Sequence, residues 1–240
     1  MMKWVTLTSA WLYWIVSLPA IADDAAVVAP PSAVTSPSGI NQQFLDPELD
    51  VAEWLGRFEV ESREVYAARD AVLRACQIQQ GEQVADIGAG TGFYSRLFSQ
   101  TVGPDGWVFA VDISLRFLEH IGKRVEEEKI PNLTPVIGGF TSIRLPPDSV
   151  DLIFICDTYH HFEQPQKTLE SIYSALRSGG RLIVIDFERI PGVSRPFILE
   201  HVRAGKAEFR NEIVESGFRF VDEVQIDELE ENYLLRFRKP

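Results

Sequence analysis

A glycine-rich loop that directly follows an apolar run constrains the fold of this chain most strongly. Residues 84–95 read VADIGAGTGFYS, with glycines at 88, 90 and 92 after the apolar run 83–87. Such glycines let the backbone turn sharply and pass close to a ligand at the N-terminus of the next helix. A dinucleotide fingerprint needs a glycine at position 93, and a P-loop needs a lysine after its last glycine. The chain has Phe93 and no such lysine. The loop therefore predicts a ligand site between a strand and a helix that lacks the residues for binding phosphate. The alternative is a glycine turn that serves only packing.

Short apolar runs alternate with helical patterns along the rest of the chain. The runs are β-branched and apolar on both faces, as in buried parallel strands, so we expect an α/β doubly wound sheet. The expected strands are 83–87, 107–111, 134–137, 150–156, 181–187, 218–226 and 232–238. The expected helices are 93–102, 114–129, 166–176 and 197–216. Only residues 227–231 join the last two strands, so these two should be antiparallel neighbours.

The N-terminal part divides into three segments ahead of this main domain, 81–240. Residues 1–22 have one lysine, an apolar stretch and Ala20-Ile21-Ala22, which is the layout of a Sec signal peptide cleaved before Asp23. An uncleaved membrane anchor is the alternative, and either reading places the protein outside the cytoplasm or on the membrane. Residues 23–41 are rich in Pro, Ser and Ala and predict a flexible linker. Residues 42–80 show helical spacing and predict two helices, with Asp50 as a cap.

The charge and the cysteine count exclude several classes of partner. The 240 residues include 23 basic and 35 acidic side chains, a net charge of −12, which argues against nucleic-acid binding. Only Cys76 and Cys156 could supply thiolates, and we expect no metal site. Export would allow these two cysteines to form a disulfide, although nothing in their spacing requires one.

Three acidic residues stand at or beside the ends of predicted strands. Asp86 lies in the first strand next to the glycine loop, Asp112 closes the second, and Asp157 closes the fourth. Because the carboxyl ends of parallel strands meet at one edge, these carboxylates should converge on a single ligand site. An acid at the end of the second strand suits a ribose diol, and three acids tolerate a cationic ligand but would repel a pyrophosphate. The combination favours a nucleoside that carries positive charge.

With these motifs, residues 59–240 resemble the class I S-adenosylmethionine-dependent methyltransferases. The loop DTYHHFEQP, 157–165, resembles the small-molecule branch related to ubiquinone-biosynthesis enzymes, and the segment 201–223 resembles exported bacterial members. The resemblance implies a Rossmann-like methyltransferase fold with seven strands in the order 3-2-1-4-5-7-6, the seventh antiparallel, and a turn at 177–181 before the fifth strand. It implies S-adenosylmethionine as the cofactor and a small molecule as the methyl acceptor. The cofactor-binding residues it implies are Asp86, Gly88, Ala89, Gly90, Gly92, Phe93, Asp112, Ile113, Phe140 and Asp157.

The segments that follow the third and fourth expected strands also contain candidate site residues. Many family members have an aspartate after the third strand that holds adenine, whereas this chain reads Ile137-Gly138-Gly139-Phe140. We expect Phe140 to stack on adenine while backbone groups replace the acid. His160 and His161 follow the fourth strand and are candidate catalytic bases, or wall residues that only shape the loop.

The sequence thus predicts an exported methyltransferase of a small molecule. A catalytically silent binding protein on the same fold is the second hypothesis, because the cofactor is made in the cytoplasm and fold does not guarantee activity. A nicotinamide oxidoreductase is the third, and Phe93 argues against it.

Overall fold

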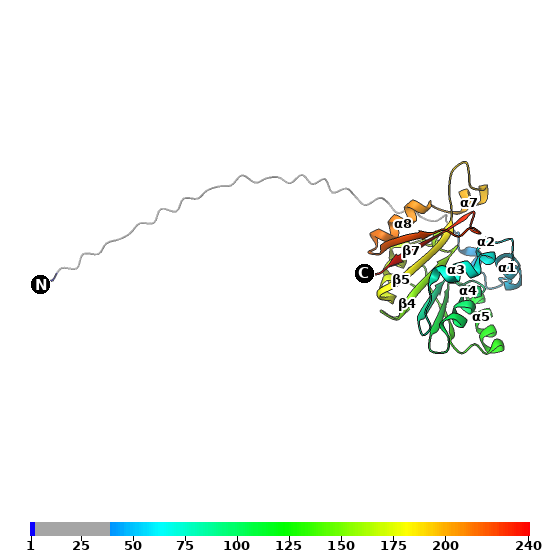
Figure 1. Cartoon of the computed structure of the whole chain (residues 1–240), viewed down its shortest axis with the longest axis horizontal. Helices are drawn as coiled ribbons and strands as arrows, with labels where there is room; N and C mark the ends of the chain where they lie inside the picture. The colour runs from blue at the N-terminus through cyan, green and yellow to red at the C-terminus, as the bar shows by residue number, and fades with distance from the viewer. Residues whose placement is uncertain (3–38) are drawn as a thin grey trace. The chain divides into compact units, whose positions relative to one another are not determined.

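Seven strands form one mixed sheet in the computed structural model, which describes residues 1–2 and 39–240 (Figure 1). The strand order is β3-β2-β1-β4-β5-β7-β6, and β7 runs antiparallel to both of its neighbours. This order and the antiparallel seventh strand confirm the predicted fold. The strands are β1 (Gln83–Ile87), β2 (Trp107–Asp112), β3 (Leu133–Ile137), β4 (Val150–Cys156), β5 (Leu176–Phe187), β6 (Arg219–Val224) and β7 (Asn232–Arg238).

Helices cover both faces of the sheet because the strands are apolar on both faces. In β1, Val84 points to one face while Ala85 and Ile87 point to the other, and each side chain joins a different buried cluster. One cluster packs α3 (Arg69–Cys76), α4 (Phe93–Val102) and α5 (Leu115–Glu128) on the sheet, and the other packs α6 (Pro165–Ala175), α7 (Pro196–His201) and α8 (Lys206–Glu215) (Figure 1). The carboxyl ends of the parallel strands therefore stay open between two helical layers.

The N-terminal segment contains more pieces than the two predicted helices. It forms the 3₁₀ turn η1 (Gln42–Phe44), α1 (Val51–Phe58), α2 (Glu64–Ala67) and α3. Asp50 caps α1 as predicted, because its carboxylate accepts a hydrogen bond from the Ala52 N–H. The second predicted helix is divided at Ala68, whose backbone angles leave the helical region.

Two further predictions about secondary structure were wrong. The single helix expected over 197–216 is two helices, α7 and α8, since the backbone is extended at Val202 and at Gly205. The connecting segment carries Arg203, whose guanidinium is buried in a two-bond ion pair with Glu212 of α8. The turn expected at 177–181 lies within β5, which pairs with β4 through a register shift.

The predicted signal peptide 1–22 lies outside the described residues except for Met1 and Met2, and so does the predicted linker 23–41 apart from its last three positions. Within the described residues, no helix has the length and apolar character needed to cross a membrane. Cys76 and Cys156 are both free thiols, so the disulfide that export would allow is not formed.

Candidate functional site

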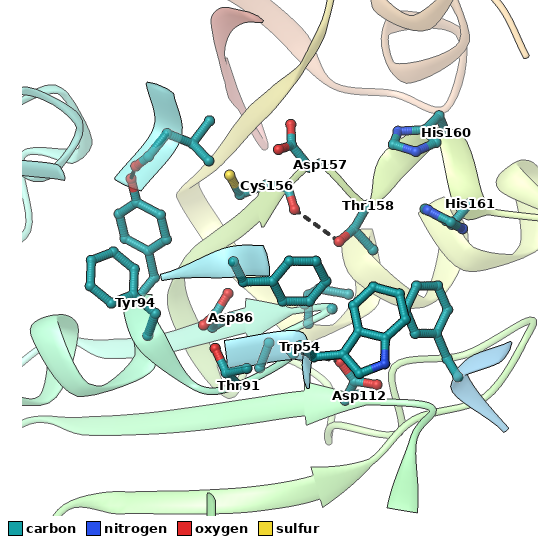
Figure 2. A pocket seen from close by; sticks show the side chains of 18 of the residues that line it. Trp54, Asp86, Thr91, Tyr94, Asp112, Cys156, Asp157, Thr158, His160 and His161 are labelled. Atoms are coloured by element: carbon teal, nitrogen blue, oxygen red, sulfur yellow. Dashed lines mark hydrogen bonds between the residues drawn. The ribbon is translucent and has the colours of Figure 1, made fainter. Parts of the chain in front are cut away.

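A cavity of about 910 Å³ opens at the carboxyl ends of β1, β2 and β4 (Figure 2). The glycine loop and Asp112 line one part of it, and the 3₁₀ turn η2 (Tyr159–His161) lines another. Residues of η1, α1 and α2 form the wall opposite the sheet. A cavity of this size accommodates a nucleoside together with a small second ligand. Of the twelve residues predicted for the site, eleven line this cavity and only Gly92 does not.

Two positions of the loop require glycine for different structural reasons. Gly88 has a φ of +74°, and a Cβ there would lie 2.3 Å from the side chain of Thr158. Only glycine therefore lets the loop after β1 cross the loop after β4 at this distance. Gly92 also has a positive φ, and it packs against Ile121 of α5 rather than facing the cavity.

Asp112 joins the end of β2 to the glycine loop. Its carboxylate accepts hydrogen bonds from the Gly90 N–H and the Ser114 N–H, both at 2.8 Å. The side chain is buried, and this burial raises the pKa of Asp112 against the opposing effect of these backbone donors. The carboxylate oxygens keep further lone pairs for hydroxyl groups of a ligand in the cavity.

Asp86 lines the cavity, next to Thr91 in Figure 2. The Ser95 hydroxyl donates a hydrogen bond to it at 2.6 Å. Burial raises the pKa of Asp86 to about 7, although the Ser95 hydrogen bond opposes this and the nearby Asp112 adds to it. A cationic group next to Asp86 would therefore favour the ionised carboxylate.

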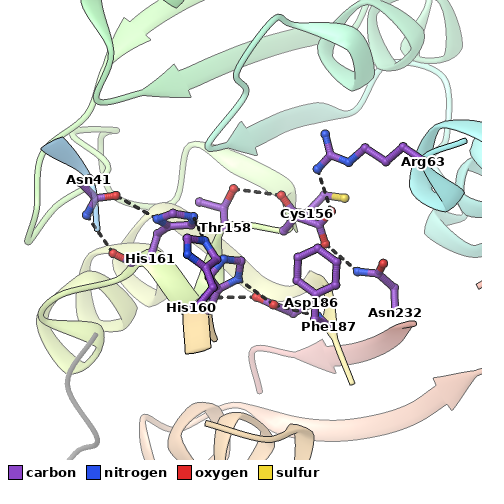
Figure 3. Close-up of polar contacts among 11 residues, drawn as sticks. Asn41, Arg63, Cys156, Thr158, His160, His161, Asp186, Phe187 and Asn232 are labelled. Atoms are coloured by element: carbon purple, nitrogen blue, oxygen red, sulfur yellow. Dashed lines mark hydrogen bonds and ion pairs between the residues drawn. The ribbon is translucent and has the colours of Figure 1, made fainter. Parts of the chain in front are cut away.

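Asp157 is held by two partners that the sequence analysis did not find. Arg63 donates to one carboxylate oxygen at 2.7 Å, and the amide of Asn232 donates to the other at 2.6 Å (Figure 3). Burial raises the pKa of Asp157 despite the attraction of Arg63. The three predicted acids therefore line one cavity, and Arg63 of the N-terminal segment offsets the negative charge of Asp157. No local motif marks Arg63, because its position beside the sheet depends on how α1 and α2 fold back.

An aromatic wall formed by Phe44, Trp54 and Phe58 covers the cavity. The ring centroids of Trp54 lie 5.0 Å from those of both Phe44 and Phe58. Trp54 of α1 lines the cavity (Figure 2). The helical spacing of Trp54 and Phe58 predicts α1, and the structure shows that this apolar face of α1 lines the cavity. Phe140, predicted to contact adenine, also lines the cavity and is 40% exposed.

His160 and His161 lie across the cavity from Asp112 (Figure 2). The Nδ1 atom of His160 is 2.8 Å from a carboxylate oxygen of Asp186, and both side chains are fully buried. The Nδ1 atom of His161 is 3.1 Å from the side-chain oxygen of Asn41 (Figure 3). Both predicted histidines are therefore held by a polar partner on one ring nitrogen.

A third histidine, His201 of α7, completes this cluster. Its Nε2 atom is 3.4 Å from the Nε2 atom of His161. Burial and the neighbouring imidazoles lower the pKa of His161 to about 2, and burial also lowers the pKa of His201, so both rings are neutral at physiological pH. Neither His201 nor Asp186 was predicted from the sequence. Asp186 is the last residue but one of β5 and follows the same strand-end rule as Asp112. His201 lies 40 residues from His161, and only the fold brings them together.

The sequence matches the protein family described as "Methyltransferase domain" over residues 78–235. A demethylmenaquinone methyltransferase of Listeria welshimeri is 27% identical over 131 residues, which are 54% of this chain and 56% of that protein. The ubiquinone/menaquinone biosynthesis C-methyltransferase UbiE of Pasteurella multocida is 31% identical over 119 residues, 47% of this chain and 42% of that protein. The chain thus spans about half the length of the curated relatives it matches.

Solved structures share the fold at lower identity. A SAM dependent methyltransferase from Aquifex aeolicus superimposes with a TM-score of 0.70 at 22% identity, over 80% of this chain and 99% of that one. The [4+2]-cyclase SpnF has a TM-score of 0.63 at 13% identity, over 72% of this chain and 80% of that one. These likenesses concern the fold, which also supports a protein described as a cyclase.

Proposed function

This chain belongs to the methyltransferase-domain family, and from that membership we propose that it transfers a methyl group from S-adenosylmethionine to a small-molecule acceptor. The observation that carries the proposal is the hydrogen bond from the Gly90 N–H to Asp112, which fixes the glycine loop beneath the cavity. S-adenosylmethionine supplies an electrophilic methyl group on a sulfonium. The chain then needs to bind that cofactor, orient an acceptor and manage one proton.

The residues around the loop fit such a cofactor. Asp112 lies at the end of β2, where its remaining lone pairs suit the hydroxyls of a ribose. The loop at Gly88–Gly90 has no side chain larger than a methyl group, so its backbone approaches the methionine part. Asp86 is positioned to accept the ammonium group, and Phe140 offers a ring for adenine. An acidic pocket also suits the positive sulfonium better than a pyrophosphate.

The acceptor would lie where the aromatic wall of Phe44, Trp54 and Phe58 adjoins the histidine cluster, since the Phe44 and His161 rings meet edge to face at 5.5 Å. Aromatic rings on one side and imidazoles on the other favour a small planar or apolar molecule with one polar group. The names of two relatives, a demethylmenaquinone methyltransferase and a ubiquinone/menaquinone biosynthesis C-methyltransferase, agree with an aromatic acceptor of this kind. The imidazoles of the histidine cluster are neutral and border the cavity, so they would orient a polar group of the acceptor by hydrogen bonds.

We also propose that the protein is exported, on the basis of residues 1–22. N-terminal sequencing of the protein from its native host should then begin at Asp23. An intact Met1 on protein recovered from the cytoplasm would contradict export and leave the proposed activity unaffected.

Calorimetric titration of the full chain with S-adenosylmethionine and, in parallel, with NAD tests the proposed function. We expect saturable binding of S-adenosylmethionine at one site per chain and no binding of NAD. Binding of NAD alone would favour the oxidoreductase and overturn the proposal. Binding of S-adenosylmethionine without methyl transfer to any of a panel of phenols, quinols and thiols would favour a silent binding protein.

A further inference from the structure

Three of the four histidines in the chain meet in one place. His160 and His161 come from η2, and His201 comes from α7, which brings it next to them at the cavity. One ring nitrogen of each lies within 4.8 Å of those of the other two. The ring centroids of His201 lie 5.0 Å from those of both other histidines, at steep interplanar angles, so the rings meet edge to face instead of stacking as a trio. All three also line the cavity.

The spacing of the ring nitrogens suits a tetrahedral ion. Zn–N bonds of about 2.0–2.1 Å place two ligand nitrogens about 3.3–3.4 Å apart in a tetrahedral site. The Nε2 atoms of His161 and His201 are 3.4 Å apart. Because all three ligand atoms lie within 4.8 Å of one another, small side-chain rotations bring the third nitrogen to the same spacing.

The opposite ring nitrogens of two of these histidines have the partners found around metal-binding imidazoles. A ligating histidine almost always donates its other N–H to a carboxylate or a carbonyl oxygen, which fixes the tautomer and the orientation of the ring. His160 Nδ1 lies 2.8 Å from the buried Asp186 carboxylate, and His161 Nδ1 lies 3.1 Å from the Asn41 side-chain oxygen (Figure 3). With a proton on each Nδ1, the Nε2 atoms carry lone pairs.

We propose that His160, His161 and His201 together bind one divalent transition-metal ion of the Zn²⁺ type, with a fourth position open to the cavity. Three neutral imidazoles with an open position are the donor set of catalytic zinc sites. This departs from the sequence analysis, which expected no metal. The chain order conceals the site, since His201 is separated from the histidine pair by α6 and β5.

The role of this ion in methyl transfer rests on the proposed function. The open position would accept a lone pair from an O–H or S–H group of the acceptor, and the ion would make that proton easier to lose to water. The oxygen or sulfur would then attack the methyl carbon, and the carbon–sulfonium bond would break with its electron pair moving to the sulfur. The products are the methylated acceptor, the demethylated thioether and one proton.

The test uses the full chain without a polyhistidine tag, treated with a chelator and then titrated with Co²⁺. We expect one Co²⁺ per chain, with the intense visible absorption of a tetrahedral site, and displacement by Zn²⁺. His201→Gln and His161→Gln should each weaken Co²⁺ binding at least about 100-fold and remove the tetrahedral spectrum. Asp186→Asn should weaken it about 10- to 100-fold, because the partner of His160 Nδ1 loses its charge. His120→Gln is the matched control, since His120 lies in α5 outside the cavity, and it should leave binding unchanged.

Urea unfolding and S-adenosylmethionine titration of each variant separate the possible failures. Absence of Co²⁺ binding by a chain that still binds S-adenosylmethionine would overturn the metal site and leave the proposed function standing. Tetrahedral Co²⁺ binding by a chain that does not bind S-adenosylmethionine would support the metal site and overturn the proposed function. Unchanged Co²⁺ binding in a folded His201→Gln variant would also overturn the three-histidine site.

Discussion

The Gly90 N–H donates a 2.8 Å hydrogen bond to the carboxylate of Asp112, 22 residues further along the chain. The bond ties the loop after β1 to the end of β2, two strands that lie side by side in the sheet. Asp112 therefore holds the shape of the glycine loop, and under the proposed function its remaining lone pairs would bind the ribose of the cofactor.

Asp112→Ala should weaken the binding of S-adenosylmethionine by about 2–4 kcal/mol, because two charge-assisted hydrogen bonds to a diol are lost. Calorimetric titration measures the change directly. Asp105→Ala is the control, since Asp105 is an exposed acid in the turn before β2 and carries the same charge. Equal affinities in the two variants would remove Asp112 from the cofactor site.

Gly88→Ala should destabilise the chain by about 2 kcal/mol more than Gly81→Ala. Both glycines have a positive φ, so both variants suffer backbone strain, but only the Gly88 Cβ would meet another group, Thr158 at 2.3 Å. Urea unfolding compares the two. The double variant Gly88→Ala with Thr158→Gly should recover much of the difference, and no recovery would show that the cost is not steric.

Arg63→Met should lower the free energy of unfolding by about 2–3 kcal/mol, because the buried Asp157 carboxylate loses its cation. The value lies below that of a fully enclosed pair since 26% of the Arg63 side chain is exposed. Adding Asp157→Asn should restore most of the stability, because asparagine also tolerates the positive φ at position 157. Arg69→Met, which breaks an exposed pair with Glu61, should cost less than about 1 kcal/mol in the same urea titration.

Asp86 should make the folded chain less stable as pH rises from about 4 to about 7. Its pKa in the folded chain is about 7, above the ordinary value near 4, so the folded state binds up to one proton more than the unfolded state in this interval. The Asp86 contribution is complete below the unfolded pKa and is lost as pH rises through the folded pKa, with a slope of up to about 1.4 kcal/mol per pH unit.

Asp86→Asn should remove this part of the pH dependence while keeping an acceptor for the Ser95 hydroxyl. Urea unfolding at pH 5 and pH 7 gives the comparison, and Asp105→Asn serves as the control. A slope that is the same in Asp86→Asn and in the unmodified chain would show that Asp86 is ionised in the folded state throughout this range.

Replacement of the cavity histidines should slow methyl transfer without weakening cofactor binding. His160→Gln, His161→Gln and His201→Gln should each lower kcat by about 10²–10⁴, because each removes one ligand of the proposed ion that would assist proton loss. His120→Gln should leave kcat unchanged. A loss confined to one of the three variants would instead indicate a single imidazole base and would contradict the shared metal site.

The sequence by itself determined which segments form the strands and the part of the site that is local in the chain. Strand 83–87, its glycine loop and helix 93–102 occupy the residues predicted for them, because apolar periodicity and glycine spacing act over a few neighbouring residues. Asp86 and Asp112 reach the same cavity because parallel strands end at one edge, a rule that needs only the strand order.

Tertiary structure decided the contacts between segments that are distant in the chain. Arg63 meets Asp157 across 94 residues, Asn41 meets His161 across 120, and His201 meets the histidine pair across 40. None of these pairs has a spacing that marks it in the sequence, since each depends on how η1, α2 or α7 packs over the open edge of the sheet. Local periodicity specifies that these helices form, whereas their packing decides which side chains they bring to the cavity.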